Sequence, residues 1–167
     1  FFSTMQVAGK EKHQAVNRKG EKQQLLQKPK EVKYQNKALD KIEELKEKHG
    51  SLEQYFDNVQ ISCKVGKENN MYLSAEGLVL PCCWVAGNMY KWWQKPGQNQ
   101  VWELIQESGG KDAFDASKYG LEAVLSNDYF SKNLVESWGK PNTHAGKPMV
   151  CSKTCGKEFD AFAEQFK

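Results

Sequence analysis

Hydrophobic positions recur with a helical period in the first part of the chain. The spacing predicts a helix over residues 37–49, capped by Asn36 and ended by Gly50. A second, shorter helix is predicted directly after it, because Ser51 and Gln54 have the spacing of a capping box. Two helices are therefore expected before the first strand-like segment.

The period then changes to the two-residue alternation that is typical of strands. Residues 59–63 alternate in this way, with Val59 and Cys63 on one face. Residues 71–75 and 78–83 are predicted as two further strands. The connection between them is Glu76-Gly77, in which glycine can adopt a positive φ. This β-hairpin is the strongest strand signal in the chain.

Helical periods return in the second half of the chain. We predict helices over residues 98–108, 117–125 and 127–138, and a terminal helix over 159–166. Residues 1–35 show no sustained period, and we expect a loop or linker there with one short strand at most. The predicted fold class is α+β, a small β-hairpin with surrounding helices that a metal cluster braces.

The amino-acid composition differs between the two parts of the chain, and it also bears on the partners and the cellular compartment of the protein. Residues 1–50 hold 12 of the 24 Lys and Arg, whereas all five Trp lie after residue 80. We therefore expect a Lys-rich extension or linker over 1–57 and a compact domain over 58–167. The net charge of +3 is too small to indicate a nucleic-acid binder, and no apolar run reaches the roughly 18–20 residues that span a bilayer. The first residues do not resemble a signal peptide, so we expect a cytoplasmic protein; lacking an initial Met, the chain is expected to be part of a longer one.

Five cysteines in a reducing compartment favour metal or redox chemistry over disulfides. The predicted hairpin folds the chain back between Cys63 and Cys82, with Gly77 at its turn, so these two thiols can approach each other. Cys151 and Cys155 are separated by three residues and precede the predicted terminal helix, whose N-terminus favours their negative charge. Four thiolates are the number that a [4Fe–4S] cluster, a [2Fe–2S] cluster or a structural zinc ion needs.

These spacings resemble a known family. Cys63, thirteen residues, Gly77, four residues and Cys82 resemble the opening of SPASM and twitch domains, the C-terminal auxiliary-cluster domains of radical-SAM enzymes. The run from Cys151 to Cys155 resembles their closing Cys-x-x-x-Cys. The resemblance covers roughly residues 58–167. It implies one [4Fe–4S] cluster held by these four cysteines, and a role in substrate binding or electron transfer.

The chain departs from the family pattern in two ways, which limit the expectation to one cluster and to no catalysis by this chain alone. Five cysteines cannot hold two four-thiolate clusters, so the chain is similar to the single-cluster twitch variant. It has no Cys-x-x-x-Cys-x-x-Cys loop, which in radical-SAM enzymes binds the cluster that cleaves S-adenosylmethionine, and we expect no catalysis by this chain alone. The resemblance implies a radical-SAM core domain or protein as partner and a peptide or protein as substrate. From the hydropathy and the charge we expect no membrane, and nucleic acid is not the expected partner.

Other interpretations of the same residues stay open. The cysteines could be ordinary buried thiols. Zinc satisfies the same four ligands, and the chain would then be a stand-alone zinc-stabilised binding module whose Lys-rich arm contacts nucleic acid. A third interpretation is the remnant of a truncated radical-SAM gene, with structure and without activity.

The residues around the cysteines also have predicted roles. Cys83 is expected to be a core thiol beside Trp84, and a swap with Cys82 as ligand is the alternative. His144 is a further alternative ligand, although a surface position is expected for it. An aromatic cluster is expected to pack around the hairpin and shield the metal; its members are Trp84, Tyr90, Trp92, Trp93 and Trp102.

Overall fold

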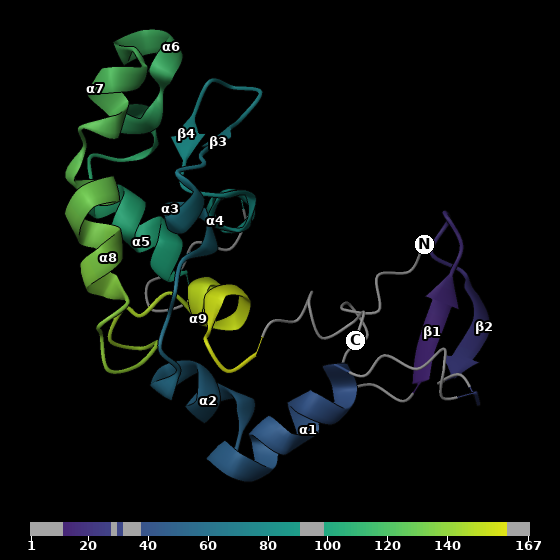
Figure 1. Cartoon of the computed structure of the whole chain (residues 1–167). Coiled ribbons are helices and arrows are strands. Elements are labelled where there is room, and N and C mark those ends of the chain that lie inside the picture. Colours follow the sequence, from purple (N-terminus) through teal and green to yellow (C-terminus); the bar gives the residue numbers. More distant parts are fainter. Residues whose placement is uncertain (1–11, 28–29, 32–37, 91–98, 160–167) are drawn as a thin grey trace. The chain divides into compact units, whose positions relative to one another are not determined.

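The computed structural model describes residues 12–27, 30–31, 38–90 and 99–159 (Figure 1). These residues divide into two units, of which the first ends at Leu52 and the second begins at Glu53. Helices and two small antiparallel two-stranded sheets make up the described residues. The predicted α+β class is therefore confirmed.

The first unit contains a hairpin followed by a helix. Strands β1 (Lys12–Val16) and β2 (Lys22–Gln27) pair antiparallel. The prediction for residues 1–35, a loop with one short strand at most, is wrong. Most described side chains of the two strands are exposed, so no apolar alternation marks them in the sequence.

One side chain holds the turn between β1 and β2. The Oδ1 atom of Asn17 accepts hydrogen bonds from the backbone N–H groups of Lys19 at 2.9 Å and Glu21 at 3.0 Å. Gly20 takes the left-handed conformation, with a φ of 81°. This turn chemistry, rather than a hydrophobic pattern, is the signal that would have found the hairpin.

Two helices follow where the apolar spacing predicts them. Helix α1 spans Ala38–His49 and ends at Gly50, whose φ is 84°. Helix α2 spans Leu52–Asn58, and the second unit begins within its first turn, at Glu53. The cap predicted at Asn36 lies outside the described residues.

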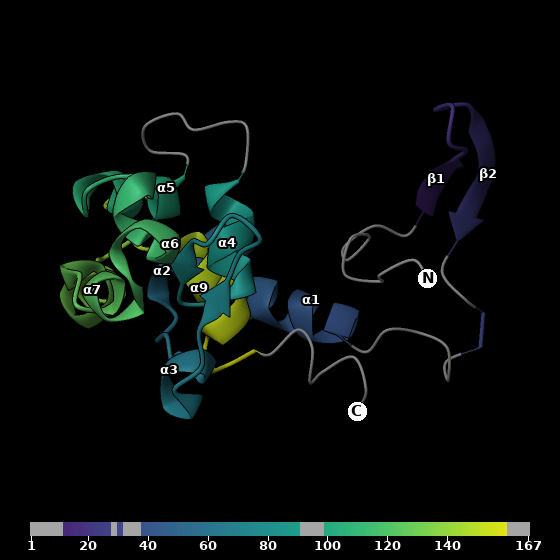
Figure 2. The same cartoon turned by 90° about the horizontal axis from the view of Figure 1, so that it is seen from above.

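The second unit is mostly helical. In both views α9 lies beside α4 (Figures 1 and 2). The elements after α2 are α3 (Lys64–Glu68), β3 (Tyr72–Leu73), β4 (Val79–Leu80), α4 (Cys83–Met89), α5 (Gln100–Glu107), the 3₁₀ helix η3 (Lys111–Phe114), α6 (Ala116–Tyr119), α7 (Leu121–Leu125), the π-helical turn η4 (Tyr129–Asn133), α8 (Leu134–Ser137) and α9 (Met149–Cys155).

The β3–β4 hairpin lies where it is predicted but is shorter. Its ladder is two residue pairs long, against predicted strands over 71–75 and 78–83. The backbone N–H of Ser74 donates to the carbonyl of Leu78 at 2.9 Å, which continues the pairing beyond the two strands and leaves three residues, 75–77, in the turn instead of the predicted two. Gly77 is the third of them and has the expected positive φ, 85°.

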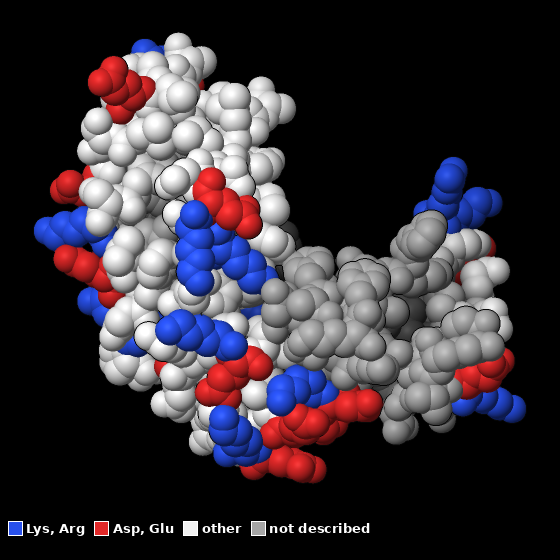
Figure 3. Space-filling model, in the orientation of Figure 1, with Lys and Arg blue, Asp and Glu red and all other residues white. Residues whose placement is uncertain are grey.

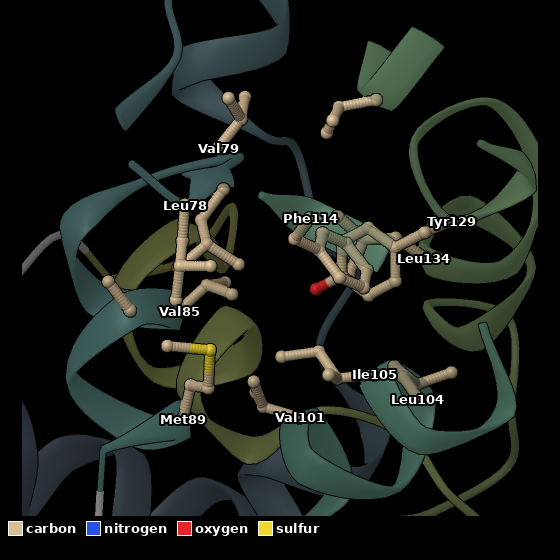
Figure 4. Packing of buried hydrophobic residues seen from close by; sticks show 13 residues of the cluster. Leu78, Val79, Val85, Met89, Val101, Leu104, Ile105, Phe114, Tyr129 and Leu134 are labelled. Carbon is tan, nitrogen blue, oxygen red and sulfur yellow. The ribbon is translucent and has the colours of Figure 1, made fainter. Parts of the chain in front are cut away.

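The core of the second unit packs this hairpin against helices (Figure 4). Val79 and Leu80 of β4 are completely buried. The rings of Phe114 and Tyr129 meet edge to face at 4.9 Å. Figure 4 shows the hydroxyl of Tyr129 inside the cluster. The other buried members are Leu78, Val85, Ala86, Met89, Val101, Leu104, Ile105, Val124 and Leu134.

Two predicted helices are interrupted. Gly120, with a φ of 82°, separates α6 from α7, where one helix over 117–125 was expected. The helix expected over 127–138 begins with the π-helical turn η4 and continues as α8. Asn127 caps this region, because its Oδ1 accepts from the N–H of Tyr129 at 2.8 Å. Both interruptions depend on backbone conformations that a 3.6-residue period does not reveal.

The described surface mixes charges of both signs. On the face in Figure 3, basic side chains lie beside acidic ones. Lys111 pairs with Glu76 at 2.7 Å and Lys118 with Asp112 at 2.9 Å. Within the described ranges, none of the helices has the length and apolar character that crossing a membrane requires.

Candidate metal centre

Four of the five cysteines line one cavity in the second unit. They are Cys63, Cys82, Cys151 and Cys155, and the cavity between them has a volume of about 20 Å³. The rest of the lining carries no charged side chain in the described part of the chain, and consists of Ile61, Val65, Pro81, Trp84, Val85, Leu134, Trp138, Val150 and Thr154. The structure thus brings together all four cysteines that the sequence nominates as ligands.

Cys63 and Cys155 meet because two distant segments pair. Ile61 and Gly156 form an antiparallel bridge, and the N–H of Ser62 donates to the carbonyl of Cys155 at 2.8 Å. The predicted strand over residues 59–63 is therefore only this isolated bridge, and its partner is the end of α9 rather than the hairpin. The two-residue alternation predicted an extended segment correctly. This segment pairs with Gly156, which lies almost a hundred positions away in the sequence.

Gly156 is needed for this close approach. Its φ is −66°, which any residue can adopt, so its backbone conformation does not require glycine. A Cβ atom here would lie 2.6 Å from the carbonyl oxygen of Ser152 and 2.9 Å from Cγ2 of Val59. A side chain at this position would push the segment of Cys63 away from α9.

A buried lysine ties the same segments together. Lys147 is only 4% exposed, and its Nζ donates to the carbonyls of Asp57 at 2.6 Å and Val59 at 2.8 Å. Burial lowers the pKa of Lys147, and the charge of Asp57 opposes this effect. The stretch that leads into Cys63 is thereby fixed to the loop that leads into α9.

Cys63 is also the N-cap of α3, a short helix that the sequence pattern did not predict. Its Sγ accepts a hydrogen bond from the backbone N–H of Gly66 at 3.4 Å. A sulfur in this position receives a donor that suits a negative charge. The hairpin then returns the chain to Cys82, as expected.

Cys82 precedes α4 and faces the cavity, whereas Cys83 does not. Burial raises the pKa of the Cys82 thiol, while the backbone N–H groups of Val85 and Trp84 oppose the rise. Cys83 is the first residue of α4 and is exposed, so the predicted core position for Cys83 is wrong. The reason is that a helix begins at Cys83, which turns its side chain outward.

Cys151 and Cys155 lie inside α9, a helix that the sequence pattern did not predict and that starts at Met149 and ends at Cys155. The terminal helix that they were expected to precede, over residues 159–166, lies outside the described residues except for Phe159. Four positions apart, the two thiols lie on one face of the helix. Burial raises the pKa of Cys151 strongly, and the nearby Cys82, Cys155 and Cys63 add to the rise.

Two buried donors near these thiols lack acceptors. The indole Nε1–H of Trp138 has no hydrogen-bond partner of good geometry, yet it lies close enough to Cys151 to lower the pKa of that thiol. The hydroxyl of Tyr129 is also without a partner. Burial raises the pKa of Tyr129, with contributions from Cys151 and Cys82. An unpaired buried donor costs about 1–3 kcal/mol, so both groups fit a site that gains sulfur acceptors when thiolates form.

Neither Trp138 nor Tyr129 is nominated for the site by the sequence pattern. Trp138 is the last residue of the helix predicted over 127–138, and a buried indole N–H in such a helix needs an acceptor. Trp84 does line the cavity, as expected of the aromatic cluster, and Trp102 packs against the core. Tyr90 is 46% exposed. The other two predicted members, Trp92 and Trp93, lie outside the described residues.

His144 has no place among the cavity-lining residues and is exposed. In the described part of the chain, no three Cys, His, Asp or Glu side chains converge in a way that could hold a single metal ion. The four thiols surround a space with room for about one water molecule. A cluster would need more room than this, so its binding would move the surrounding side chains outward.

The donor set nevertheless fits a thiolate-bound metal centre. Without metal, buried thiols of raised pKa are neutral and chemically inert. A bound cation reverses this by favouring the thiolates. Four cysteines suit an iron–sulfur cluster or zinc. Comparison of the chain with protein-family models, with curated proteins and with solved structures gave no match.

Proposed function

We propose that the second unit is an auxiliary [4Fe–4S] cluster domain that works with a radical-SAM core, in which Cys63, Cys82, Cys151 and Cys155 are the ligands. One observation carries this proposal: four of five cysteines, from three separate segments, line one cavity. Ordinary core thiols have no reason to gather in this way. The resemblance of the cysteine spacing to SPASM and twitch domains supports the same function.

The choice of a cluster over zinc rests on the resemblance to SPASM and twitch domains, because zinc takes the same four thiolates. Four thiolates around one zinc ion, at about 2.3 Å from it, must all approach a common centre. In a [4Fe–4S] cluster each cysteine binds a different iron. Metal analysis therefore decides between the two.

The residues of this chain have distinct parts in such a centre. Each cysteine gives up its thiol proton at Sγ, which the buried setting of Cys82 and Cys151 opposes until positive charge is present. The N–H of Gly66 and the indole of Trp138 offer hydrogen bonds to sulfur. A bound cluster supplies one-electron redox capacity and a cross-link between segments.

The proposed contribution to the larger enzyme is threefold. The cross-link braces the hairpin end against α9, and the free energy of metal binding becomes folding free energy. Electron transfer and assistance in substrate binding follow from the resemblance to auxiliary-cluster domains. The sequence contains no Cys-x-x-x-Cys-x-x-Cys loop, so the chain alone is expected to form no 5′-deoxyadenosine from S-adenosylmethionine and reductant.

Anaerobic purification with iron, sulfide and zinc analysis tests the proposal. We expect a brown protein with a broad band near about 400 nm and about four irons per chain. Cys155→Ser should lose both, whereas the matched variant Cys83→Ser, at an exposed cysteine outside the cavity, should keep them.

Two results would contradict the cluster. A colourless protein with one zinc ion would indicate a zinc-stabilised binding module instead. A protein without iron or zinc after anaerobic purification and reconstitution would mean that the cysteines are ordinary buried thiols.

A further inference from the structure

A second, larger hollow adjoins the cysteine cavity in the same unit. This groove has a volume of about 310 Å³, which is within the range of ligand sites in proteins, about 300–1,000 Å³. Its apolar walls include Met71, Leu125, Phe130 and Val135. No lining residue in the described part of the chain is charged. Seven of its twelve described lining residues do not line the cysteine cavity.

The groove and the cysteine cavity share walls. Cys63, Pro81 and Trp138 are among the residues that line both. A molecule in the groove would therefore lie beside one of the four thiols and against the indole ring. The groove itself is formed by protein side chains alone, so it does not require a metal.

Local backbone features shape the two sides of the groove. Phe130 belongs to the π-helical turn η4, a rare conformation that is frequent at functional sites. Met71 and Val135 are each 46% exposed, so the rim presents apolar side chains to water. These side chains would be desolvated by an apolar occupant, which favours its binding.

Two asparagines, Asn69 and Asn70, are among the described residues that line the groove. The Nδ2 of Asn70 donates to the carboxylate of Glu68 at 2.8 Å, which leaves the amide oxygen of Asn70 able to accept a hydrogen bond. A ligand that carries one neutral donor, such as an amide or a hydroxyl, would find an acceptor here. An anion would meet no cationic side chain among the described lining residues and would lie near the Glu68 carboxylate.

We infer that the groove binds a small uncharged molecule with an aromatic or aliphatic body and one amide or hydroxyl group. The volume sets the size, the described lining residues offer no cation to an anionic ligand, and the amide of Asn70 orients the polar end. This binding site goes beyond the proposed cluster, because it needs no metal. Its position places the ligand next to Cys63.

A series of three indoles that differ in charge tests the inference. Titration followed by calorimetry or ligand-observed NMR should show saturable binding of neutral indole-3-acetamide, with a Kd of about 1 mM or tighter. The anion indole-3-acetate should bind at least about tenfold more weakly, because it loses hydration near the Glu68 carboxylate without gaining a cationic partner. The cation tryptamine should also bind more weakly than the amide, because the apolar walls desolvate its ammonium group. Failure of the amide to saturate by about 10 mM, or equal affinity for all three, overturns the inference.

Exposed rim positions provide a matched pair of variants. Val135→Lys places a charge at the rim and should weaken binding of indole-3-acetamide at least about tenfold. Leu73→Lys changes a side chain that is 63% exposed and does not line the groove, so its affinity should match the parent. Both are surface substitutions, which preserve folding. Equal affinities of the two variants would contradict the site.

The same samples separate this inference from the cluster proposal. Metal content is measured before each titration. A protein without iron that binds the amide supports the groove and contradicts the cluster. A brown protein that binds none of the three indoles supports the cluster and contradicts the groove.

Discussion

The two hairpins of this chain differ in what holds them. The β1–β2 hairpin has the longer ladder, but its side chains are largely exposed, and a Cβ at Gly20 would meet nothing within 4 Å. The β3–β4 hairpin has two residue pairs, yet Val79 and Leu80 are completely buried and Gly77 accepts a hydrogen bond from Ala116 at 2.9 Å. Tertiary packing, not ladder length, makes a hairpin part of a core.

The proposed metal centre adds to this difference, because it lies at the end of the second hairpin only. Anaerobic removal of the metal with a chelator should lower the free energy of unfolding of the β3–β4 hairpin by roughly several kcal/mol, because metal binding is coupled to folding. Amide hydrogen exchange should rise across residues 63–82 and α9, and stay unchanged across β1 and β2. Unchanged exchange in both hairpins would mean that the centre does not brace the fold.

Truncation of one leucine in each hairpin should change the free energy of unfolding by different amounts. Leu80→Ala should lower the free energy of unfolding of the second unit by about 2–5 kcal/mol, because it leaves a cavity at a completely buried position. Leu25→Ala in β2, where the side chain is 48% exposed, should change stability by less than about 0.5 kcal/mol. Denaturant unfolding measures both, with Leu73→Ala as an exposed control in the same hairpin as Leu80.

Glycine replacement compares the two turns. Gly20 and Gly77 both have a positive φ, which alanine disfavours. Gly20→Ala should therefore lower the free energy of unfolding of its hairpin by about 1–2 kcal/mol. Gly77→Ala should cost about 1 kcal/mol more, since its Cβ would lie 3.3 Å from the side chains of Asp115 and Ser117. Local amide exchange in each hairpin gives the two values; equal costs would show that the second turn tolerates the contact.

The smallest expected effect is a change in the reduction potential of the proposed cluster, with both hairpins unchanged. Trp138→Phe removes the indole N–H near Cys151 and keeps an aromatic ring. We expect full iron content, a lower reduction potential of the cluster, and unchanged exchange in β3 and β4. Voltammetry or an EPR-monitored redox titration measures the potential, and Trp102→Phe, at a tryptophan outside the cavity lining, is the control.

Hydrophobic patterns predicted the elements that pack. Helices α1 and α2 and the buried hairpin were found, because their apolar faces repeat with the period of the structure. The β1–β2 hairpin was missed since its strands bury little. The breaks at Gly120 and at η4 were missed because they are backbone events inside otherwise regular apolar patterns.

The candidate site was only partly predictable. Cysteine spacing nominated the four residues that line the cavity, and the hairpin explained why Cys63 and Cys82 approach. Nothing local indicated that α9 contains Cys151 and Cys155, or that the donors of Trp138 and Tyr129 face them. The adjoining groove was likewise invisible in the sequence, because its walls come from residues 63 to 138.

The sequence by itself nominated the four cysteines and located α1, α2, α5 and the buried turn, because these depend on neighbours within a few positions. Only the tertiary structure decided which of two adjacent cysteines enters the cavity, since a helix starting at Cys83 turns that side chain outward. It also decided that Ile61 pairs with Gly156, because contact between segments so far apart requires the whole core to pack first.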